Sequence, residues 1–564
     1  MLTSQIAYRL KSAVWISAFS FLLCVVADLV SPTRSQASDA RHEMVAAEGA
    51  LAADAGLEVM KHGGNAVDAA VATSLVLGVT NAASCGIGGG GFMLIYWAQD
   101  HKLYGLDYRE RAPMTVTPAS YLRDGKPDER LARTGALAVA VPGELAGLDA
   151  ALRRFGSMRF SQLSRQAIRL ARDGFPISPH LAKDIRLTAA DISHQPGFRT
   201  VFFNDAGLPL QAGAIAHNPA LAALLERLGN DPVQDFYHGK SAHQLVDYLA
   251  RNGGLLTLRD LAEYRPIWRS PISVEYRGYQ VYTMPPPSSG GIVLEILKMI
   301  ESEPIAHLAA DSPRYLAYLV PMMRQGFVDR SAYADPAYVK VPVAQLLSAS
   351  HILQAREVAL RKNRAVPAIA VVHDHGTSNF CVVDRHRNVV VVTTTINTIF
   401  GAKMMVPEMG VVLNNEMDDF TVAPGVPNAF KLTQSAANEI APGKRPLSSM
   451  SPLIAFRDGR PVLAAGGSGG PTIISSVLQV TLNQLDFRLT PAQAIAQPRV
   501  HDQADPDMVL AESNLPAATF SALRQMGYRV KSVSELGAVN SIRIDPEVLM
   551  GAFDQRKGGG VAGD

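Results

Sequence analysis

Two threonines lie at the ends of a segment that is typical of a β-hairpin. Two apolar or β-branched runs, 380–384 and 389–395, are separated by polar residues that suit a hairpin loop. If the turn centres on His386, Thr377 lies directly opposite Thr395, with Cβ atoms roughly 4.5–5.5 Å apart on one face of the sheet. The spacing therefore predicts that two hydroxyl groups meet at the strand ends.

The residue before Thr377 suggests what this pair could do. Gly376 has no side chain, so other backbone can crowd the Gly376–Thr377 bond. Cleavage there would leave Thr377 with a hydroxyl nucleophile and with its own α-amine as general base. This is the chemistry of an N-terminal nucleophile, although threonine is also common in ordinary strands.

Ser468 is a second candidate nucleophile, in the sequence Gly-Gly-Ser-Gly-Gly over 466–470. It matches G-x-S-x-G between an expected strand and an expected helix, which is the context of an α/β-hydrolase elbow. Such an enzyme needs an acid and then a histidine downstream, and the only later histidine is His501, shortly after Asp486. A serine hydrolase therefore remains an alternative, with spacing that is short for that fold.

Residues 86–91 fit the dinucleotide-binding pattern G-x-G-x-x-G. That loop must lead from a strand into a helix, whereas residues 92–97 have the pattern of a strand. We therefore expect these glycines to allow close backbone packing or a turn.

Helical and strand patterns alternate along the rest of the chain. Helices are expected over 46–61, 146–155, 160–173 and 473–485, and strands over 92–97, 389–395 and 462–465. The segment 354–375 is polar and basic at first and lacks a clear period, which is typical of the exposed lead-in to a processing site.

Composition excludes some classes of protein but does not identify one. The 564 residues carry a formal charge of +2, which gives no general electrostatic footprint for nucleic acid. Three cysteines are too few and too scattered for a disulfide framework, and we expect Cys85 and Cys381 to be free and buried. An apolar run over 13–27 follows two basic residues, so residues 1–37 are expected to be a signal peptide, with an uncleaved anchor as the rival.

Seven blocks, in one order from about residue 40 to beyond 540, resemble the γ-glutamyltransferase family. They are 63–70 (GGNAVDAA), 86–94 (GIGGGGFML), 107–113 (DYRERAP), 141–144 (VPGE), 286–291 (PPSSGG), 413–420 (LNNEMDDF) and 445–452 (RPLSSMSP). One block alone would be weak evidence for this resemblance, but seven blocks in the same order make it specific.

The resemblance implies an α+β fold, a four-layer αββα sandwich with two stacked antiparallel sheets. In the family, two subunits cut from one precursor form this fold jointly. Carried onto this chain, residues 38–376 would form the large subunit and residues 377–564 the small catalytic subunit. The cleavage site would be the bond between Gly376 and Thr377.

The resemblance also implies a role for each matching site residue. The implied catalytic residues are Thr377 as nucleophile, Thr395 as the group that orients it, and Gly469 and Gly470 as backbone N–H donors of an oxyanion hole. The implied substrate-binding residues are Arg109, Ser448 and Ser449 for an α-carboxylate, and Glu416 and Asp419, with Asn397 beside them, for an α-ammonium.

The implied activity is that of a self-processing γ-glutamyltransferase. It would cleave the γ-glutamyl bond of glutathione and related compounds and pass the group to water, an amino acid or a dipeptide. No cofactor or nucleic acid is implied, and no metal, because the histidines have no ligand spacing with cysteines or carboxylates. The expected signal peptide implies a secreted or periplasmic enzyme, with a membrane-anchored form less favoured.

Three positions depart from the family pattern. Asn379 and Cys381 replace a usual histidine and serine, and Phe430 stands where some bacterial members have a lid tyrosine. Two alternatives therefore stay open, a glutaryl-type (cephalosporin) acylase on the same scaffold and a catalytically silent binding homologue. Acylases of that type bind no α-amine, so the presence of both Glu416 and Asp419 favours a glutamyl donor.

Overall fold

The computed structural model describes residues 36–361, 376–423, 425–432 and 435–564. The segment Ala37–Asp564 forms one compact unit, and the expected signal peptide lies almost entirely outside the described residues. None of the helices in the described ranges is long and apolar enough to cross a lipid bilayer.

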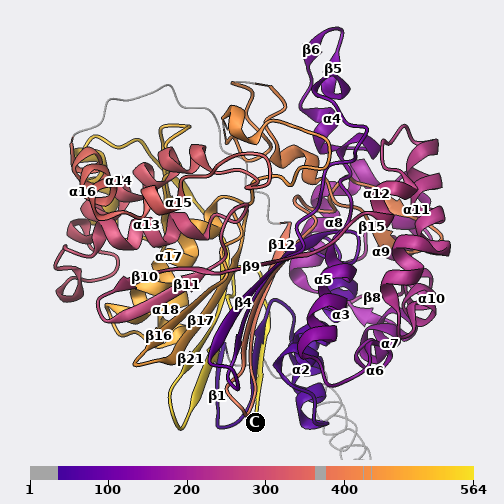
Figure 1. Ribbon diagram of the computed structural model, residues 1–564, viewed down its shortest axis with the longest axis horizontal. Helices are drawn as coiled ribbons and strands as arrows, with labels where there is room; N and C mark the ends of the chain where they lie inside the picture. The colour runs from indigo at the N-terminus through magenta and orange to yellow at the C-terminus, as the bar shows by residue number, and fades with distance from the viewer. Residues whose placement is uncertain (1–35, 362–375, 424, 433–434) are drawn as a thin grey trace, which may run out of the picture. The chain divides into compact units, whose positions relative to one another are not determined.

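Two seven-stranded sheets form the centre of the unit, and every pair of neighbouring strands in them is antiparallel (Figure 1). The first has the order β1 (Ala37–Ala40), β22 (Leu549–Ala552), β21 (Ala538–Ile544), β17 (Arg460–Ser468), β16 (Leu453–Arg457), β11 (Tyr279–Thr283) and β10 (Ile272–Tyr276). The second has the order β23 (Gly560–Gly563), β2 (Met44–Ala47), β12 (Thr377–Val383), β13 (Val389–Thr395), β3 (Gly90–Trp97), β4 (Lys102–Asp107) and β9 (Ile267–Arg269). Each sheet therefore combines strands from both sides of residue 377.

Helices cover the outer face of each sheet, so the expected four-layer sandwich is confirmed (Figure 1). One helical layer contains α13 (Gly290–Ile300), α14 (Pro313–Asp329), α16 (Ala349–Leu360) and α17 (Thr472–Leu485), and the other contains α2 (Ala50–Lys61), α3 (Ala66–Thr80) and α5 (Glu144–Phe155). Alternate side chains of β12 enter different cores: Phe380 and Val382 pack toward α3, and Cys381 packs toward the other sheet.

Two of the expected helices differ from the structure. Residues 46–61 are not one helix, because Met44–Ala47 forms strand β2 and pairs with β12 before α2 begins. Residues 160–173 form two short helices, α6 (Phe160–Leu163) and α7 (Arg165–Asp173), that meet at Ser164. In the first case a distant strand supplies a hydrogen-bonding edge that local propensity cannot reveal.

The glycines near residue 90 allow close backbone packing, as expected. A Cβ atom on Gly89 would lie 2.0 Å from the Thr395 carbonyl oxygen, and one on Gly91 would lie 2.4 Å from the Thr393 carbonyl oxygen. These contacts bring β3 tightly against β13 and so help to fix the strand that carries Thr395. Cys85 and Cys381 are free and buried, which confirms that expectation.

Candidate functional site

The hairpin has the predicted register. Thr377 pairs with Thr395 across β12 and β13, and Asn379 pairs with Thr393. The hydroxyl oxygens of Thr377 and Thr395 lie 3.0 Å apart, and both side chains are buried.

The hydrogen bonds of Thr395 fix the direction of the proton between the two threonines. Thr395 Oγ1 accepts a hydrogen bond from the Asn397 backbone N–H at 2.8 Å and lies 3.1 Å from the carbonyl oxygen of Gly376. Because a carbonyl oxygen can only accept, the single hydroxyl proton of Thr395 points to Gly376. The Thr377 hydroxyl must then donate to Thr395, so Thr395 contacts the nucleophile and the carbonyl of the expected cleavage site at once.

Gly376 is enclosed by backbone. A Cβ atom there would lie 2.3 Å from the carbonyl carbon of Thr398 and 2.4 Å from the carbonyl oxygen of Asn397. No side chain fits without a shift of the segment that follows β13. Asn397 itself has a left-handed backbone, with φ of 76°, and its Nδ2 donates to the Asn415 carbonyl at 3.0 Å.

A buried polar network lies next to Thr377, the predicted nucleophile. Asn379 Nδ2 donates to Glu48 Oε1 at 2.5 Å, and the Ser468 hydroxyl donates to the same oxygen. Lys557 pairs with Glu48 at 3.2 Å and also donates to the carbonyl oxygen of Thr377. Asn379 therefore joins β12 to β17 through Glu48, and Lys557 holds the backbone of Thr377.

This network overturns the serine-hydrolase alternative. Ser468 is fully buried and its hydroxyl donates to Glu48. His501 instead contacts Ser475 at 2.9 Å and Gln503 at 3.0 Å. Within the described ranges Ser468 thus has no histidine partner that could act as its general base.

Gly469 and Gly470 lie in the turn between β17 and α17, at the end of β17 where Ser468 contacts Glu48. Both have left-handed backbone, with φ of 126° and 58°. A Cβ atom on Gly470 would lie 2.7 Å from the ring of Phe430, so that ring packs directly on the turn. The turn precedes a helix N-terminus, where backbone N–H groups and the helix dipole favour negative charge.

Arg109, Glu110, Glu416 and Asp419 form a second buried group, here named the Arg109 cluster. Arg109 Nη1 lies 2.7 Å from Glu416 and 3.4 Å from Glu110, and Arg109 Nη2 contacts Asp419. The guanidinium is 1% exposed. The predicted binding residues for a carboxylate and for an ammonium are therefore in direct contact.

Acidic side chains outnumber the single arginine in the Arg109 cluster. Three carboxylates surround one guanidinium, and burial raises the pKa of Glu416 and Asp419 while the charge of Arg109 opposes that rise. Burial likewise raises the pKa of Glu110 to about 8, again opposed by Arg109. A cation that entered this group would favour the ionised forms of these acids and could pair with them.

Ser448 and Ser449 lie beside this cluster without touching Arg109 through their side chains. Arg109 Nε donates to the Pro446 carbonyl at 3.3 Å, which ties Arg109 to the segment that carries both serines. Ser448 Oγ accepts a hydrogen bond from the Met450 N–H at 3.2 Å. Ser449 Oγ accepts one from Arg330 at 3.2 Å.

The sequence model of the family described as gamma-glutamyltranspeptidase matches residues 52–564. The chain belongs to the γ-glutamyltranspeptidase family.

Named relatives cover nearly the whole chain. It is 38% identical to a glutathione hydrolase proenzyme of Escherichia coli over 94% of this chain and 92% of that protein. It is 39% identical to a glutathione hydrolase proenzyme of Pseudomonas aeruginosa over 91% and 93%. Among solved structures, a cephalosporin acylase from Bacillus halodurans matches with a TM-score of 0.83 and 29% identity over 95% of this chain and 98% of that chain.

Sequence reasoning missed three side chains of this γ-glutamyltranspeptidase site. They are Glu48 and Lys557, which hold the strands around the nucleophile, and Arg330, which holds Ser449. Each is far in sequence from the group it contacts. Glu48 directly follows β2, which pairs with β12, but the sequence predicts a helix from residue 46 that includes Glu48 itself.

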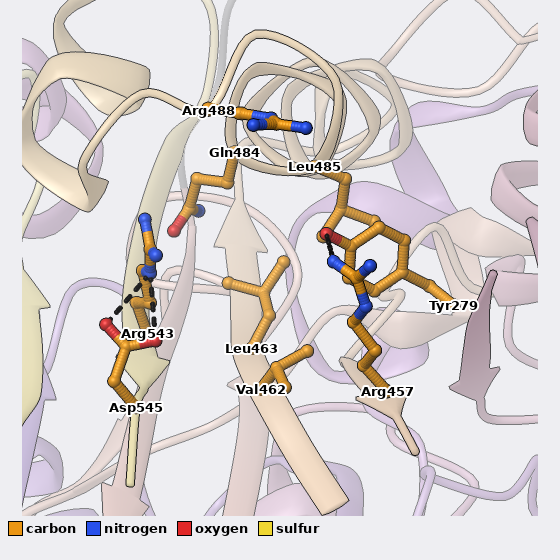
Figure 2. A pocket seen from close by; sticks show the side chains of 9 residues that line it. All are labelled: Tyr279, Arg457, Val462, Leu463, Gln484, Leu485, Arg488, Arg543 and Asp545. Carbon is orange, nitrogen blue, oxygen red and sulfur yellow. Dashed lines mark hydrogen bonds and ion pairs between the residues drawn. The ribbon is translucent and has the colours of Figure 1, made fainter. Parts of the chain in front are cut away.

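A cavity of about 250 Å³ opens at the other end of β17 (Figure 2). Val462 and Leu463 form part of its floor, and Arg543 pairs with Asp545 at its wall. None of the predicted site residues lines it. The cavity is therefore separate from the nucleophile end of the strand.

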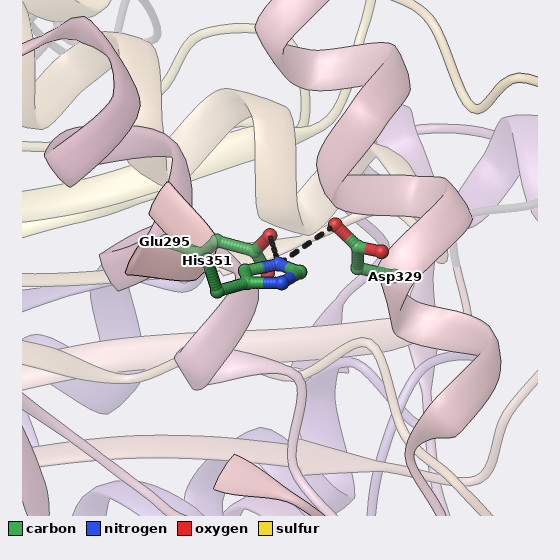
Figure 3. A group of neighbouring side chains, drawn as sticks. All are labelled: Glu295, Asp329 and His351. Carbon is green, nitrogen blue, oxygen red and sulfur yellow. Dashed lines mark hydrogen bonds and ion pairs between the residues drawn. The ribbon is translucent and has the colours of Figure 1, made fainter. Parts of the chain in front are cut away.

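One histidine lies beside two carboxyl groups from segments that are distant in the sequence. His351 Nε2 lies 3.3 Å from Glu295 and 3.3 Å from Asp329, where α13, α14 and α16 meet (Figure 3). Sequence spacing gave no sign because three separate helices contribute one residue each. Burial and the neighbouring Asp329 raise the pKa of Glu295 to about 10, so Glu295 holds a proton at neutral pH.

Proposed function

We propose that this chain is a self-processing γ-glutamyl hydrolase and transferase that acts on glutathione and related γ-glutamyl compounds. The observation that carries the proposal is the Thr377–Thr395 hydroxyl pair at the Gly376 carbonyl. The Arg109 cluster supplies both signs of charge that a γ-glutamyl donor requires. Two relatives that carry the name glutathione hydrolase proenzyme support the same activity and a precursor form.

Self-cleavage follows from the contacts of Thr395. Thr377 Oγ1 attacks the carbonyl carbon of Gly376, and the Thr395 hydroxyl donates to the carbonyl oxygen as negative charge develops there. The Gly376–Thr377 C–N bond then breaks, and the proton from the Thr377 hydroxyl ends on the freed amine. Water hydrolyses the resulting ester, which leaves a carboxylate on Gly376 and a free hydroxyl and α-amine on Thr377.

The same threonine then serves turnover. The freed amine takes the hydroxyl proton of Thr377 as the oxygen attacks the γ-carbonyl of the donor. The N–H groups of Gly469 and Gly470 would stabilise the oxyanion, and the amine returns the proton to the leaving nitrogen. Attack by water or by an acceptor amine releases the γ-glutamyl group and restores Thr377.

The Arg109 cluster would bind the amino-acid end of the donor. The planar Arg109 guanidinium can hold both oxygens of an α-carboxylate, and Glu416 and Asp419 can hold an α-ammonium. These groups already pair with one another, so a zwitterionic donor replaces the ion pairs of Arg109 with Glu416 and Asp419 by ion pairs of the same groups with the ligand. Because no buried charge is left alone, that exchange avoids a large desolvation cost.

A glutaryl-type acylase is the second candidate, and the full-length likeness to a cephalosporin acylase supports it. A glutaryl group offers a carboxylate to Arg109 but no ammonium to the acids around it. The surplus of carboxylates in the Arg109 cluster therefore favours a γ-glutamyl donor.

Fragment analysis, active-site labelling and turnover assays test the proposal. Intact masses of the purified protein should reveal two associated fragments, with the smaller beginning at Thr377, and N-terminal sequencing of the larger fragment should locate the end of the proposed signal peptide. A mechanism-based glutamine analogue should add its mass to Thr377. Turnover of a glutaryl anilide but not of a γ-glutamyl anilide would instead identify an acylase, and absence of turnover and labelling would identify a silent homologue.

A further inference from the structure

Arg330 is a buried arginine that contacts neutral hydroxyl groups. It directly follows α14, its exposed fraction is 4%, and its Nε donates to Ser289 Oγ at 2.9 Å while Nη2 donates to Ser449 Oγ at 3.2 Å. Arg324, within α14, is different because it pairs with Asp502 at 3.0 Å and also with Asp507. In the described part of the chain no carboxylate lies within ion-pair distance of Arg330.

The electrostatic setting of Arg330 links it to the Arg109 cluster. Burial lowers the pKa of Arg330 to about 10, the negative charge of Asp419 opposes this shift, and the positive charge of Arg109 adds to it. Arg330 therefore stays protonated at neutral pH and lies within electrostatic reach of both signs of charge in the cluster. A buried cation without a paired carboxylate favours an anion nearby.

The hydrogen bonds of Arg330 determine where two serine protons point. A guanidinium can only donate, so Ser289 Oγ and Ser449 Oγ must accept from it. The Ser289 hydroxyl proton then goes to the Ser448 carbonyl, at 2.6 Å. Ser449 Oγ makes no other hydrogen bond within the described residues, so its proton is left for a further acceptor.

Ser448 is arranged in the same way. Its Oγ accepts from the Met450 N–H, and its own proton has no acceptor in the described ranges. Two neighbouring hydroxyl groups thus present their protons while protein donors occupy their oxygens. Such a pair suits a ligand that only accepts hydrogen bonds, which is the case for a carboxylate.

We propose that Arg330 is a positioning residue that turns the Ser449 hydroxyl proton toward the α-carboxylate of the donor. Through Ser289 it also fixes the Ser448 carbonyl, and its positive charge stabilises the bound anion from behind the serines. This inference rests on the proposed γ-glutamyl function, because it assigns the carboxylate end of that donor.

The first test compares Arg330→Met and Arg330→Lys with the wild-type enzyme on a γ-glutamyl anilide. Arg330→Met should raise KM by about tenfold, the scale of one hydrogen bond to a charged group, and change kcat by less than about threefold. Arg330→Lys keeps the charge but cannot reach both serines. Its KM should therefore lie between that of wild type and that of Arg330→Met. Arg324→Lys, at a buried arginine within α14 that pairs with two aspartates, is the matched control and should leave KM unchanged.

A double-mutant cycle separates positioning from general structural support. In a Ser449→Ala background, Arg330→Met should raise KM by clearly less than in the wild-type background, because the hydroxyl it orients is gone and only its charge and its bond to Ser289 are still lost. With a 4-aminobutyryl anilide, which lacks the α-carboxylate, Arg330→Met and wild type should have equal kcat/KM. The proposal is overturned by an unchanged KM in both Arg330 variants, by the full penalty in the Ser449→Ala background, or by an equal penalty with the 4-aminobutyryl substrate.

Failure of the proposed function would look different. In that case the wild-type enzyme itself would not turn over the γ-glutamyl anilide, and the donor assigned to Arg330 would be wrong as well. If wild type is active and only the Arg330 effects are missing, the γ-glutamyl function stands and the role of Arg330 does not. Thermal unfolding midpoints of both variants show whether each one is folded, and Arg330→Lys keeps the test valid if Arg330→Met is not.

Discussion

The nucleophile hairpin and the Arg109 cluster are both buried and polar, but the chain builds them in different ways. The hairpin is local, since one turn joins β12 to β13 and the register of that turn sets Thr377 against Thr395. The cluster is assembled from segments that are far apart in sequence, and it depends on the balance of charges when they meet. We therefore expect the chemistry of the hairpin to be lost when one of its atoms is missing or misplaced. Donor binding by the cluster should weaken when one of its charges loses its partner.

Removal of the nucleophile tests the hairpin with the largest expected effect. Thr377→Ala should give a folded, unprocessed and inactive precursor, because the attacking oxygen is gone from both self-cleavage and turnover. A denaturing gel and an assay with a γ-glutamyl anilide measure this. Ser468→Ala is the control and should be processed and keep substantial activity, since Ser468 Oγ binds Glu48. An active Thr377→Ala enzyme would refute the assignment.

Crowding at the cleavage site gives the next largest effect. Gly376→Ala keeps the nucleophile but adds a Cβ that would lie 2.3 Å from the Thr398 backbone. Overpacking by one methyl group costs about 1–3 kcal/mol, so self-cleavage should slow by roughly tenfold or more. A time course of precursor disappearance on a gel measures the rate, and cleavage at the wild-type rate would show that the close packing does not position the bond.

The same contrast explains which features could be predicted from sequence. Thr377 and Thr395 belong to one hairpin, so alternation and turn position predict their pairing. The seven blocks carry Arg109, Glu416 and Asp419, yet only the fold brings them into contact. The contact between Arg330 and Ser449 follows from neither periodicity nor spacing, because α14 and the serine segment are remote in the chain.

Strand β2 shows most clearly what local sequence patterns cannot predict. The predicted helix over 46–61 includes Ala46 and Ala47, because the alanine-rich pattern of α2 continues back into the end of this strand. Met44–Ala47 becomes a strand because β12 and β23 lie on either side of it and satisfy its backbone hydrogen bonds. Since both partners come from residues after 376, no local window contains the information.

Loss of the planar guanidinium tests the Arg109 cluster. Arg109→Lys keeps the positive charge but cannot hold a carboxylate with two parallel hydrogen bonds, so KM for a γ-glutamyl anilide should rise far more than kcat falls. The expected loss is about 1.5–3 kcal/mol, the scale of a hydrogen bond to a charged group. Arg277→Lys, at a guanidinium that contacts Asp486 away from the cluster, is the control. A KM equal to that of wild type would exclude Arg109 from donor binding.

The Glu295 group of Figure 3 sharpens the comparison, because it is also assembled from distant segments but contains no arginine. Its charge is balanced by a proton, since burial and Asp329 raise the pKa of Glu295 from 4.5 to about 10. Between these two values the folded chain holds one more proton than the unfolded chain. Stability should therefore fall as pH rises through this window, by about 1.4 kcal/mol per pH unit from this group alone.

Glu295→Gln should remove that slope, because an amide cannot ionise and keeps a donor at the same position. From pH 6 to pH 8 the wild-type unfolding midpoint should drop more than that of the variant, by an amount that corresponds to roughly 2–3 kcal/mol. Glu58→Gln, at a side chain that is 67% exposed, is the control and should follow wild type. If Glu295→Gln and wild type lose stability in parallel, the proton is not on Glu295. The balance of charge where the three helices meet must then come from another group.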